Sequence, residues 1–300
     1  MSRRIDTLAR AAYNPPQARA ESVRAGEVPM FSRRSLFRGA PAAAFALGRA
    51  ARGQSSHKRL LALIGDRYHN ADYIRVALDR VLDGLGLEVD YTISYDRLSR
   101  EMLAGYQVFL CLRDGMIWPQ GYSGPDAYPY EAGLENRSDF PDAKAQFWIR
   151  GEQAEALQEF VSKGGGFYSL HNNSHVSVTS KTWREVMGGA YIGHPALRPF
   201  RVRVVNSSHP ITQGIREFTV NDEQHYVEYD KDRKNVLLEA ENVDGLTFQN
   251  LGSKSIAGWA YDYGRGRVVF TSVGHTIHAL WNPEHIKLQK RAVRWLLREI

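Results

Sequence analysis

Short apolar runs alternate with a segment of helical period between residues 58 and 112, and this alternation limits the fold more than any other feature. Residues 60–64 form a continuous apolar run, which is typical of a strand buried on both faces. Residues 71–85 carry apolar side chains at helical spacing, and two further strands are predicted at 87–93 and 107–112. Together with a short intervening helix, this order predicts an α/β fold with a mostly parallel sheet and helices on both faces.

A second strand signal follows three consecutive glycines in the middle of the chain. Residues 151–162 predict a helix, and the glycines at 164–166 predict a turn with positive φ. Residues 167–170 then predict a short buried strand that ends at His171. Later elements are predicted as a helix at 181–187, strands at 201–205, 236–240, 255–261 and 267–271, and a closing amphipathic helix at 284–300.

The basic residues are concentrated at the N-terminus. Residues 1–56 contain ten arginines, no lysine and three acidic residues, a charge of +7, so the remainder of the +6 chain carries −1. The folded part is therefore close to neutral, which excludes nucleic acid as its partner. No run of 18 apolar residues is present, so we expect no membrane-spanning helix in the mature protein.

Residues 1–56 predict an export leader ahead of a folded domain at 57–300. Arg33 and Arg34 form a pair, which is followed by a mildly apolar, alanine-rich segment at 39–48. This order resembles a twin-arginine signal and predicts a periplasmic or extracellular protein. The alternative is a basic tail without a targeting role.

Three histidines follow predicted strands. His69 lies beyond the first strand, His171 ends the strand at 167–170, and His275 comes just after the strand at 267–271. If these strands are parallel, their carboxyl ends share one edge of the sheet, where open α/β folds bind ligands. We therefore expect the three imidazoles to converge.

Two loop residues complete the candidate site. His194 lies in a glycine-rich loop and Glu223 in an acidic one, and both can reach the same edge. Imidazoles and a carboxylate suit a divalent metal such as zinc, and equally suit general acid–base chemistry. We predict His171 and Glu223 as the catalytic residues, no nucleotide cofactor, and a metal bound by His69, His171, His194, Glu223 and His275. Asp222 and His225 are interpreted as structural, and His175 as a supporting residue.

Residues 113–150 form a long segment rich in glycine, proline and aromatic residues. Its rings either stack on sugar faces or pack the segment onto the domain. The substrate-binding candidates are Trp118, Tyr128 and Trp148, together with Asn172 beside His171. The single cysteine, Cys111, lies in an apolar run and is interpreted as a buried, inert thiol, so an internal disulfide is excluded.

Five blocks of sequence resemble the ThuA-like (trehalose utilisation) family. In chain order they are GGGFYSLH at 164–171, GGAYIGHP at 188–195, HPIT at 209–212, Asp222-Glu223, and GRGRVVFTSVGHT at 264–276. The resemblance covers about residues 58–300. It implies a flavodoxin-like fold of the class I glutamine-amidotransferase-like superfamily and a role in carbohydrate catabolism. It also implies that His69, His171, His194, Glu223 and His275 surround the family's site.

One departure from the wider superfamily narrows the chemistry. Glutamine amidotransferases carry a nucleophilic cysteine after the strand that here ends at His171, so cysteine-based glutamine hydrolysis is excluded. The first hypothesis is an exported enzyme that acts on a sugar or glycoside derivative. The alternative is a non-catalytic carbohydrate-binding module with a small carbohydrate ligand. Whether the chain forms a homo-oligomer is left open.

Overall fold

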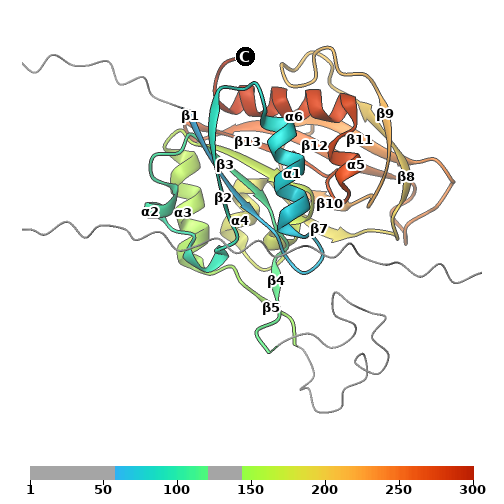
Figure 1. The fold of residues 1–300 in the computed structure, drawn as a ribbon. Coiled ribbons are helices and arrows are strands. Elements are labelled where there is room, and N and C mark those ends of the chain that lie inside the picture. The colour runs from blue at the N-terminus through green and yellow to red at the C-terminus, as the bar shows by residue number, and fades with distance from the viewer. Residues whose placement is uncertain (1–57, 121–143) are drawn as a thin grey trace, which may run out of the picture. The chain divides into compact units, whose positions relative to one another are not determined.

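The computed structural model describes residues 58–120 and 144–300, which belong to one compact unit (Figure 1). The predicted leader, with its twin-arginine pair, and Tyr128 lie outside the described residues. Within these residues, no helix is both long enough and apolar enough to cross a membrane.

One half of the main sheet is parallel and carries the carboxyl edge that matters for the site. The nine strands lie in the order β2-β1-β3-β6-β13-β12-β11-β8-β9, and the first five are parallel. Every residue of β3 and β6 is buried, because helices cover both faces there. The parallel strands are β2 (Leu87–Thr92), β1 (Lys58–Ile64), β3 (Val108–Leu112), β6 (Gly166–Leu170) and β13 (Gly266–Thr271).

The other half of the sheet is antiparallel. In β9 buried and exposed residues alternate, as in a strand with one face toward water. These strands are β12 (Lys254–Tyr263), β11 (Val236–Asn242), β8 (Arg198–Val204) and β9 (Phe218–Asp222). Two small pairs flank the sheet, β7 (Gly189–Gly193) with β10 (Tyr226–Tyr229) and β4 (Met116–Ile117) with β5 (Gln146–Phe147).

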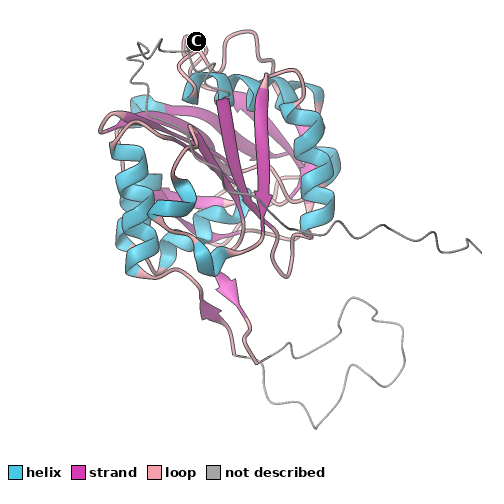
Figure 2. Ribbon diagram, turned by 60° about the vertical axis from the view of Figure 1, so that its left-hand side comes forward, coloured by secondary structure: helices cyan, strands magenta, loops and turns pink. Residues whose placement is uncertain are grey.

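Helices pack on both faces of the sheet (Figure 2). The core on one face contains α1 (Ala71–Leu82), α5 (Ile277–Leu280) and α6 (Pro283–Leu296). The core on the other face contains α2 (Arg100–Leu103), α3 (Gly151–Ser162) and α4 (Lys181–Met187). Three 3₁₀ segments complete the fold, Tyr95–Arg97, His171–Val178 and Arg233–Asn235.

Local sequence explains where the main helices begin. The Asn70 side chain accepts a hydrogen bond from the Asp72 amide and caps α1. The apolar period of α1 then buries one stripe of side chains, including Ile74 and Leu78. Asn282 caps α6 in the same way, with Pro283 at the first helical position.

The glycine run between α3 and β6 turns the chain, but only partly as predicted. Only Gly164 of the three has positive φ, at 121°. Gly165 is required for space instead, since a Cβ there would lie 2.5 Å from the Phe160 ring. A Cβ on Gly166 would lie 2.8 Å from that of Leu296 on α6. Close packing therefore places β6 between the two helix layers.

The structure confirms the predicted α/β class, with the helices of α3 and α4 at their predicted bounds. Five strands were not predicted: β4, β5, β7, β9 and β10. Cys111 is fully buried, as expected.

Candidate functional site

The three strand-end histidines meet at the carboxyl edge of the sheet. His69, His171 and His275 follow β1, β6 and β13, and these strands are parallel with only β3 inserted between β1 and β6. Nε2 of His69 lies 3.0 Å from Nδ1 of His275. The ring centroids of His69 and His171 are 5.0 Å apart. The expected convergence of these imidazoles is therefore present in the fold.

Glu223 lies at the centre of the histidines. Its Oε2 is 3.2 Å from Nδ1 of His275 and 3.5 Å from Nε2 of His171. The same oxygen is 3.4 Å from Nε2 of His225 and 3.6 Å from Nε2 of His194. All four ion pairs of Glu223 within the described residues are thus with imidazoles.

His171 presents a bare nitrogen to this carboxylate. Its Nδ1 lies 2.6 Å from the Ser272 carbonyl oxygen, which only accepts, so Nδ1 carries the proton. Nε2 is therefore a lone pair, and it is buried without a hydrogen-bond partner among the described residues. The backbone of His171 has φ 54°, and a Cβ on Gly274 would lie 2.6 Å from its Cβ, so tight packing fixes the ring.

Asp66 fixes the orientation of His69. Its Oδ1 lies 2.9 Å from Nδ1 of His69, and its Oδ2 accepts a hydrogen bond from Asn172 at 2.8 Å. Burial alone would raise the pKa of Asp66, but the His69 ring and the hydrogen bonds hold that pKa well below its usual range. The carboxylate is ionised and accepts the Nδ1 proton, which directs the lone pair of His69 Nε2 toward His275.

Asp222 fixes the loop that carries His275. At the end of β9 its buried carboxylate accepts hydrogen bonds from the amides of Gly274, His275 and Thr276, at 2.7, 3.2 and 3.0 Å. Its neighbour Glu223 is thereby held beside His275. The interpretation of Asp222 as a structural residue is consistent with these contacts.

The protonation of the cluster suits ligand binding. Burial lowers the pKa of His171 and lowers that of His225 well below its usual value, so both rings are neutral near pH 7. Burial would raise the pKa of Glu223, but its close contacts with the rings of His171, His225 and His275 lower that pKa overall. Burial lowers the pKa of His275, but Glu223 outweighs that effect and the net shift is upward.

These residues fit a divalent metal. Four of them (His69, His171, Glu223 and His275) each offer a ligand atom, all within 4.8 Å of one another, and His194, Glu223 and His225 form a second such group. Two ligands about 2.1 Å from one tetrahedral ion lie about 3.4 Å apart, close to the distances around Glu223. Charge-assisted hydrogen bonds would be shorter, at about 2.7–2.9 Å. His194 was predicted to join the first group but lies in the second.

The cluster opens into a cavity of about 410 Å³. Asn172 lines this cavity, as do Tyr191 and the pair formed by His175 and Asp114, whose Nδ1–carboxylate distance is 3.0 Å. Small-molecule sites have volumes of roughly 300–1,000 Å³, so a sugar-sized ligand is compatible with this space.

The aromatic candidates lie elsewhere. Trp118 lines a neighbouring cavity of about 480 Å³, with the Arg67 guanidinium 5.0 Å from its ring. Trp148 is only 4% exposed and packs edge-on against Trp183. Its indole nitrogen donates to the Asp114 carbonyl oxygen at 2.7 Å. Trp148 therefore packs in the core, and its predicted contact with substrate stays a prediction.

Sequence reasoning missed or set aside several residues of this edge. Asp66 was not considered, although it lies three residues before His69. His225 was interpreted as structural, yet its ring stacks on His171 with centroids 4.1 Å apart and faces Glu223. Spacing within Asp66–His69 and Glu223–His225 was the available signal.

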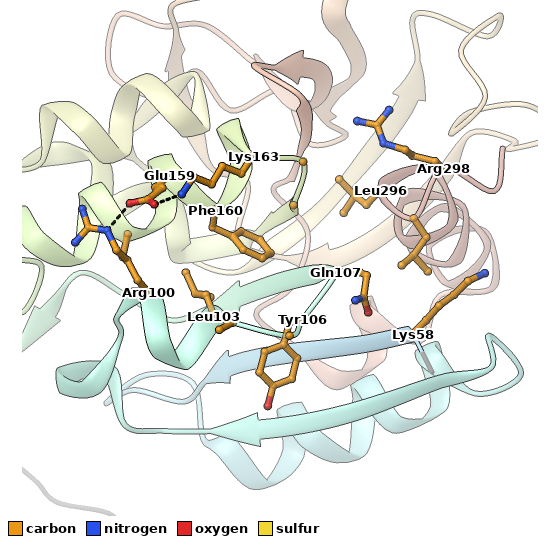
Figure 3. Close-up of a pocket in the computed structure, with 16 residues that line it drawn as sticks. Lys58, Arg100, Leu103, Tyr106, Gln107, Glu159, Phe160, Lys163, Leu296 and Arg298 are labelled. Atoms are coloured by element: carbon orange, nitrogen blue, oxygen red, sulfur yellow. Dashed lines mark hydrogen bonds and ion pairs between the residues drawn. The ribbon is translucent and has the colours of Figure 1, made fainter. Parts of the chain in front are cut away.

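A larger cavity, about 580 Å³, lies at the opposite, amino edge of the parallel strands (Figure 3). It is lined by Lys58, Gln107 and Gly165, which lie at the starts of β1, β3 and β6. Figure 3 shows Glu159 bridging Arg100 and Lys163 there. Lys58 pairs with Glu299 nearby, and none of the described residues that line this cavity is a histidine.

Comparisons with known proteins agree with this fold. A family model described as ThuA, trehalose utilisation, matches residues 139–296. A ThuA-like structure from Bacteroides uniformis is 16% identical, with a TM-score of 0.55, and the match covers 84% of this chain and 95% of that one. A ThuA-like structure from Parabacteroides merdae is 15% identical, with a TM-score of 0.56, and the match covers 80% and 89%. No curated protein matches the chain.

Proposed function

Since the chain belongs to the ThuA family of trehalose utilisation, we propose that it is a metal-dependent enzyme of carbohydrate catabolism that acts on a sugar or glycoside derivative. The metal ligands in this proposal are His69, His171, Glu223 and His275. Nitrogen and carboxylate donors of this kind favour zinc.

One observation carries the proposal: imidazole lone pairs converge on a carboxylate without a fixed cation between them. The Nε2 of His171 and the Oε2 of Glu223 are both acceptors, and they face each other at 3.5 Å. Two acceptors in a buried site repel unless a cation or proton lies between them. Because burial lowers the pKa of His171, a metal ion fits this position better than a proton does.

The residues around the ligands have separable roles. A bound divalent ion would supply Lewis acidity, which lowers the pKa of bound water and polarises an oxygen of the substrate. Asp66 orients His69, and Ser272 orients His171 through its carbonyl oxygen. His175, whose Nδ1 is held by Asp114, is positioned in the same cavity to move a proton.

A second candidate function is a non-catalytic carbohydrate-binding module. The observation that favours it is the aromatic pair beside the histidine cavity, where the rings of Tyr68 and Trp118 meet edge to face with centroids 5.7 Å apart. Such rings suit the apolar faces of sugars. This function predicts that Trp118→Ala abolishes sugar binding while His171→Ala leaves it unchanged.

The two functions are separated by assaying turnover. The full chain, loaded with Zn²⁺ or stripped by a chelator, is tested on a panel of disaccharides, trehalose included, and aryl glycosides. The enzyme proposal predicts metal-dependent turnover that His171→Ala removes and that His278→Ala, an exposed histidine on α5, retains. Equal turnover by the stripped protein, or by His171→Ala, would contradict the proposal.

Export through the twin-arginine route remains part of the proposal. The supporting feature is the order of Arg33, Arg34 and the alanine-rich segment behind them. Replacing both arginines with lysine should leave the protein in the cytoplasmic fraction of the host, whereas unchanged secretion would overturn this assignment.

A further inference from the structure

We infer that this edge binds two divalent ions, with Glu223 shared between them and His194 and His225 as the remaining protein ligands of the second ion. The inference rests on the proposed metal-dependent function and deepens it, because it assigns a second site and narrows the class of substrate.

The histidines divide into two groups of potential ligands that share only Glu223 as a member. His194 and His225 lie within 4.8 Å of each other and of Glu223, but they do not belong to the group of His69, His171 and His275. An ion bound by the first group therefore cannot also be bound by both His194 and His225. Two neighbouring ions that share a carboxylate use all six residues.

The second group presents its nitrogens to the same point. The rings of His194 and His225 are stacked, with centroids 5.2 Å apart and an angle of 26° between their planes. Nδ1 of His194 lies 2.8 Å from the Pro195 carbonyl oxygen and so carries the proton, which leaves Nε2 as a lone pair. This Nε2 faces Glu223 at 3.6 Å, too far for a hydrogen bond but suited to two ligands of one ion.

His225 completes the group from the buried side. Its Nε2 lies 3.4 Å from Glu223, and its Nδ1 is buried with no hydrogen-bond partner among the described residues. The ring is held between those of His171 and His194 by stacking. Of the two ring nitrogens of His225, Nε2 is therefore the one directed at the Glu223 carboxylate, with which it would bind the second ion.

Each group joins a buried ring to a part-exposed one: His171 is fully buried and His275 is 25% exposed, while His225 is 2% and His194 is 30% exposed. His275 and His194 both line the cavity, so a substrate that enters it would meet both ions. Paired ions stabilise the attacking and leaving oxygens of a displacement. Two neighbouring ions favour a substrate that offers two adjacent oxygens, such as the vicinal hydroxyls of a sugar ring.

Counting bound ions tests the inference without a known substrate. The full chain is dialysed against Zn²⁺, passed through a desalting column and analysed for metal per chain. We expect two ions in the wild type and one in His194→Ala. His175→Ala is the matched control, because His175 lines the same cavity but belongs to neither group, and it should retain two.

The possible failures are distinguishable. One ion in the wild type, unchanged in His194→Ala, overturns the second site and leaves the proposed function standing. No ion in the wild type overturns both. Two ions in both proteins overturn the assignment to His194 and His225. Loading with Mn²⁺ gives an independent readout, since a spin-coupled pair in electron paramagnetic resonance should become an isolated ion in His194→Ala.

Discussion

The two edges of the parallel sheet carry cavities that differ in size and in chemistry. The amino-edge cavity is the larger, at about 580 Å³ against about 410 Å³. At the amino edge, Lys58 pairs with Glu299, and Glu159 accepts from both Arg100 and Lys163. At the carboxyl edge, the described ion pairs of Glu223 are all with imidazoles, and the buried Nε2 of His171 has no hydrogen-bond partner in the part of the chain that the structure describes.

We place the candidate site by unmet bonding capacity, which differs between the edges, and not by cavity volume. At the amino edge, Lys58, Arg100 and Lys163 each have a carboxylate partner, Glu299 for the first and Glu159 for the other two. The carboxyl edge brings together nitrogen and oxygen lone pairs that a cation would bind. They lie where the parallel strands end and their loops converge. Matched substitutions, with one variant at each edge or a control elsewhere, test this contrast.

The largest effect is expected from Glu223 at the carboxyl edge, with Glu159 at the amino edge as its control. Glu223→Gln removes the charged ligand and should weaken Zn²⁺ binding by more than about 100-fold. Glu159→Gln, the same change at the amino edge, should leave Zn²⁺ affinity unchanged. Competition with a coloured chelator measures both variants, and equal affinities would remove the distinction between the edges.

A smaller loss is expected when the supporting carboxylate of His69 is changed. Asp66→Asn keeps the shape of the side chain but no longer holds Nδ1 of His69 through a charge, so Zn²⁺ affinity should fall about 10- to 100-fold. Asp90→Asn, at the surface beside Arg59, is the control and should bind Zn²⁺ normally. A normal Zn²⁺ affinity in Asp66→Asn would mean that the contact between Asp66 and His69 does not affect metal binding.

Acid should also affect the edges differently. Buried His285, whose Nδ1 donates to the Ala279 carbonyl oxygen of α5, has its pKa lowered by burial to about 4. The unfolded chain, with a histidine pKa of about 6.5, binds the proton more readily, so the free energy of unfolding falls as pH drops from about 6.5 to 4. The loss from this residue is about 3 kcal/mol.

Urea unfolding at pH 7 and pH 4.5 measures this loss. In His285→Gln the difference between the two pH values should shrink, whereas in His278→Ala, which is exposed, it should match the wild type. At the amino edge Glu159 has its pKa lowered to about 2 by Lys163 and Arg100, so its ion pairs persist across this range. An unchanged difference in His285→Gln would show that other groups cause the acid effect.

The smallest effect is expected at the amino edge itself. Lys58→Ala removes an ion pair with Glu299 in which both side chains are partly exposed. Such surface pairs contribute about 0–1 kcal/mol, so the thermal midpoint should move little and Zn²⁺ binding should not change. A loss of Zn²⁺ binding in this variant would show that the edges are coupled.

The parallel half of the fold follows from the sequence, but the site follows only in part. Residues 60–64 and 167–170 are apolar runs that predict buried strands, and the histidines after them locate the edge. The antiparallel strand β9 alternates buried and exposed residues over only five positions, too few for a clear period. It nevertheless positions Asp222 and Glu223.

The remaining site residues depend on tertiary contacts that spacing does not encode. His225 joins the cluster because the pairing of β10 with β7 brings it beside Tyr191 and His194. Trp148 was predicted to bind substrate because it is aromatic and lies in a segment rich in glycine, proline and aromatic residues. In the structure its indole nitrogen donates to the Asp114 carbonyl oxygen and its ring packs against Trp183. Whether such a side chain packs in the core or faces a cavity depends on its burial, which a single sequence does not reveal.

The central claim is tested most directly by elemental analysis of the purified full chain beside its His171→Ala form. We expect at least one stoichiometric divalent ion per chain in the wild type and its loss in His171→Ala, with both proteins folded by circular dichroism. A folded wild type that retains no divalent metal after loading, or a His171→Ala protein that retains as much as the wild type, would contradict the account.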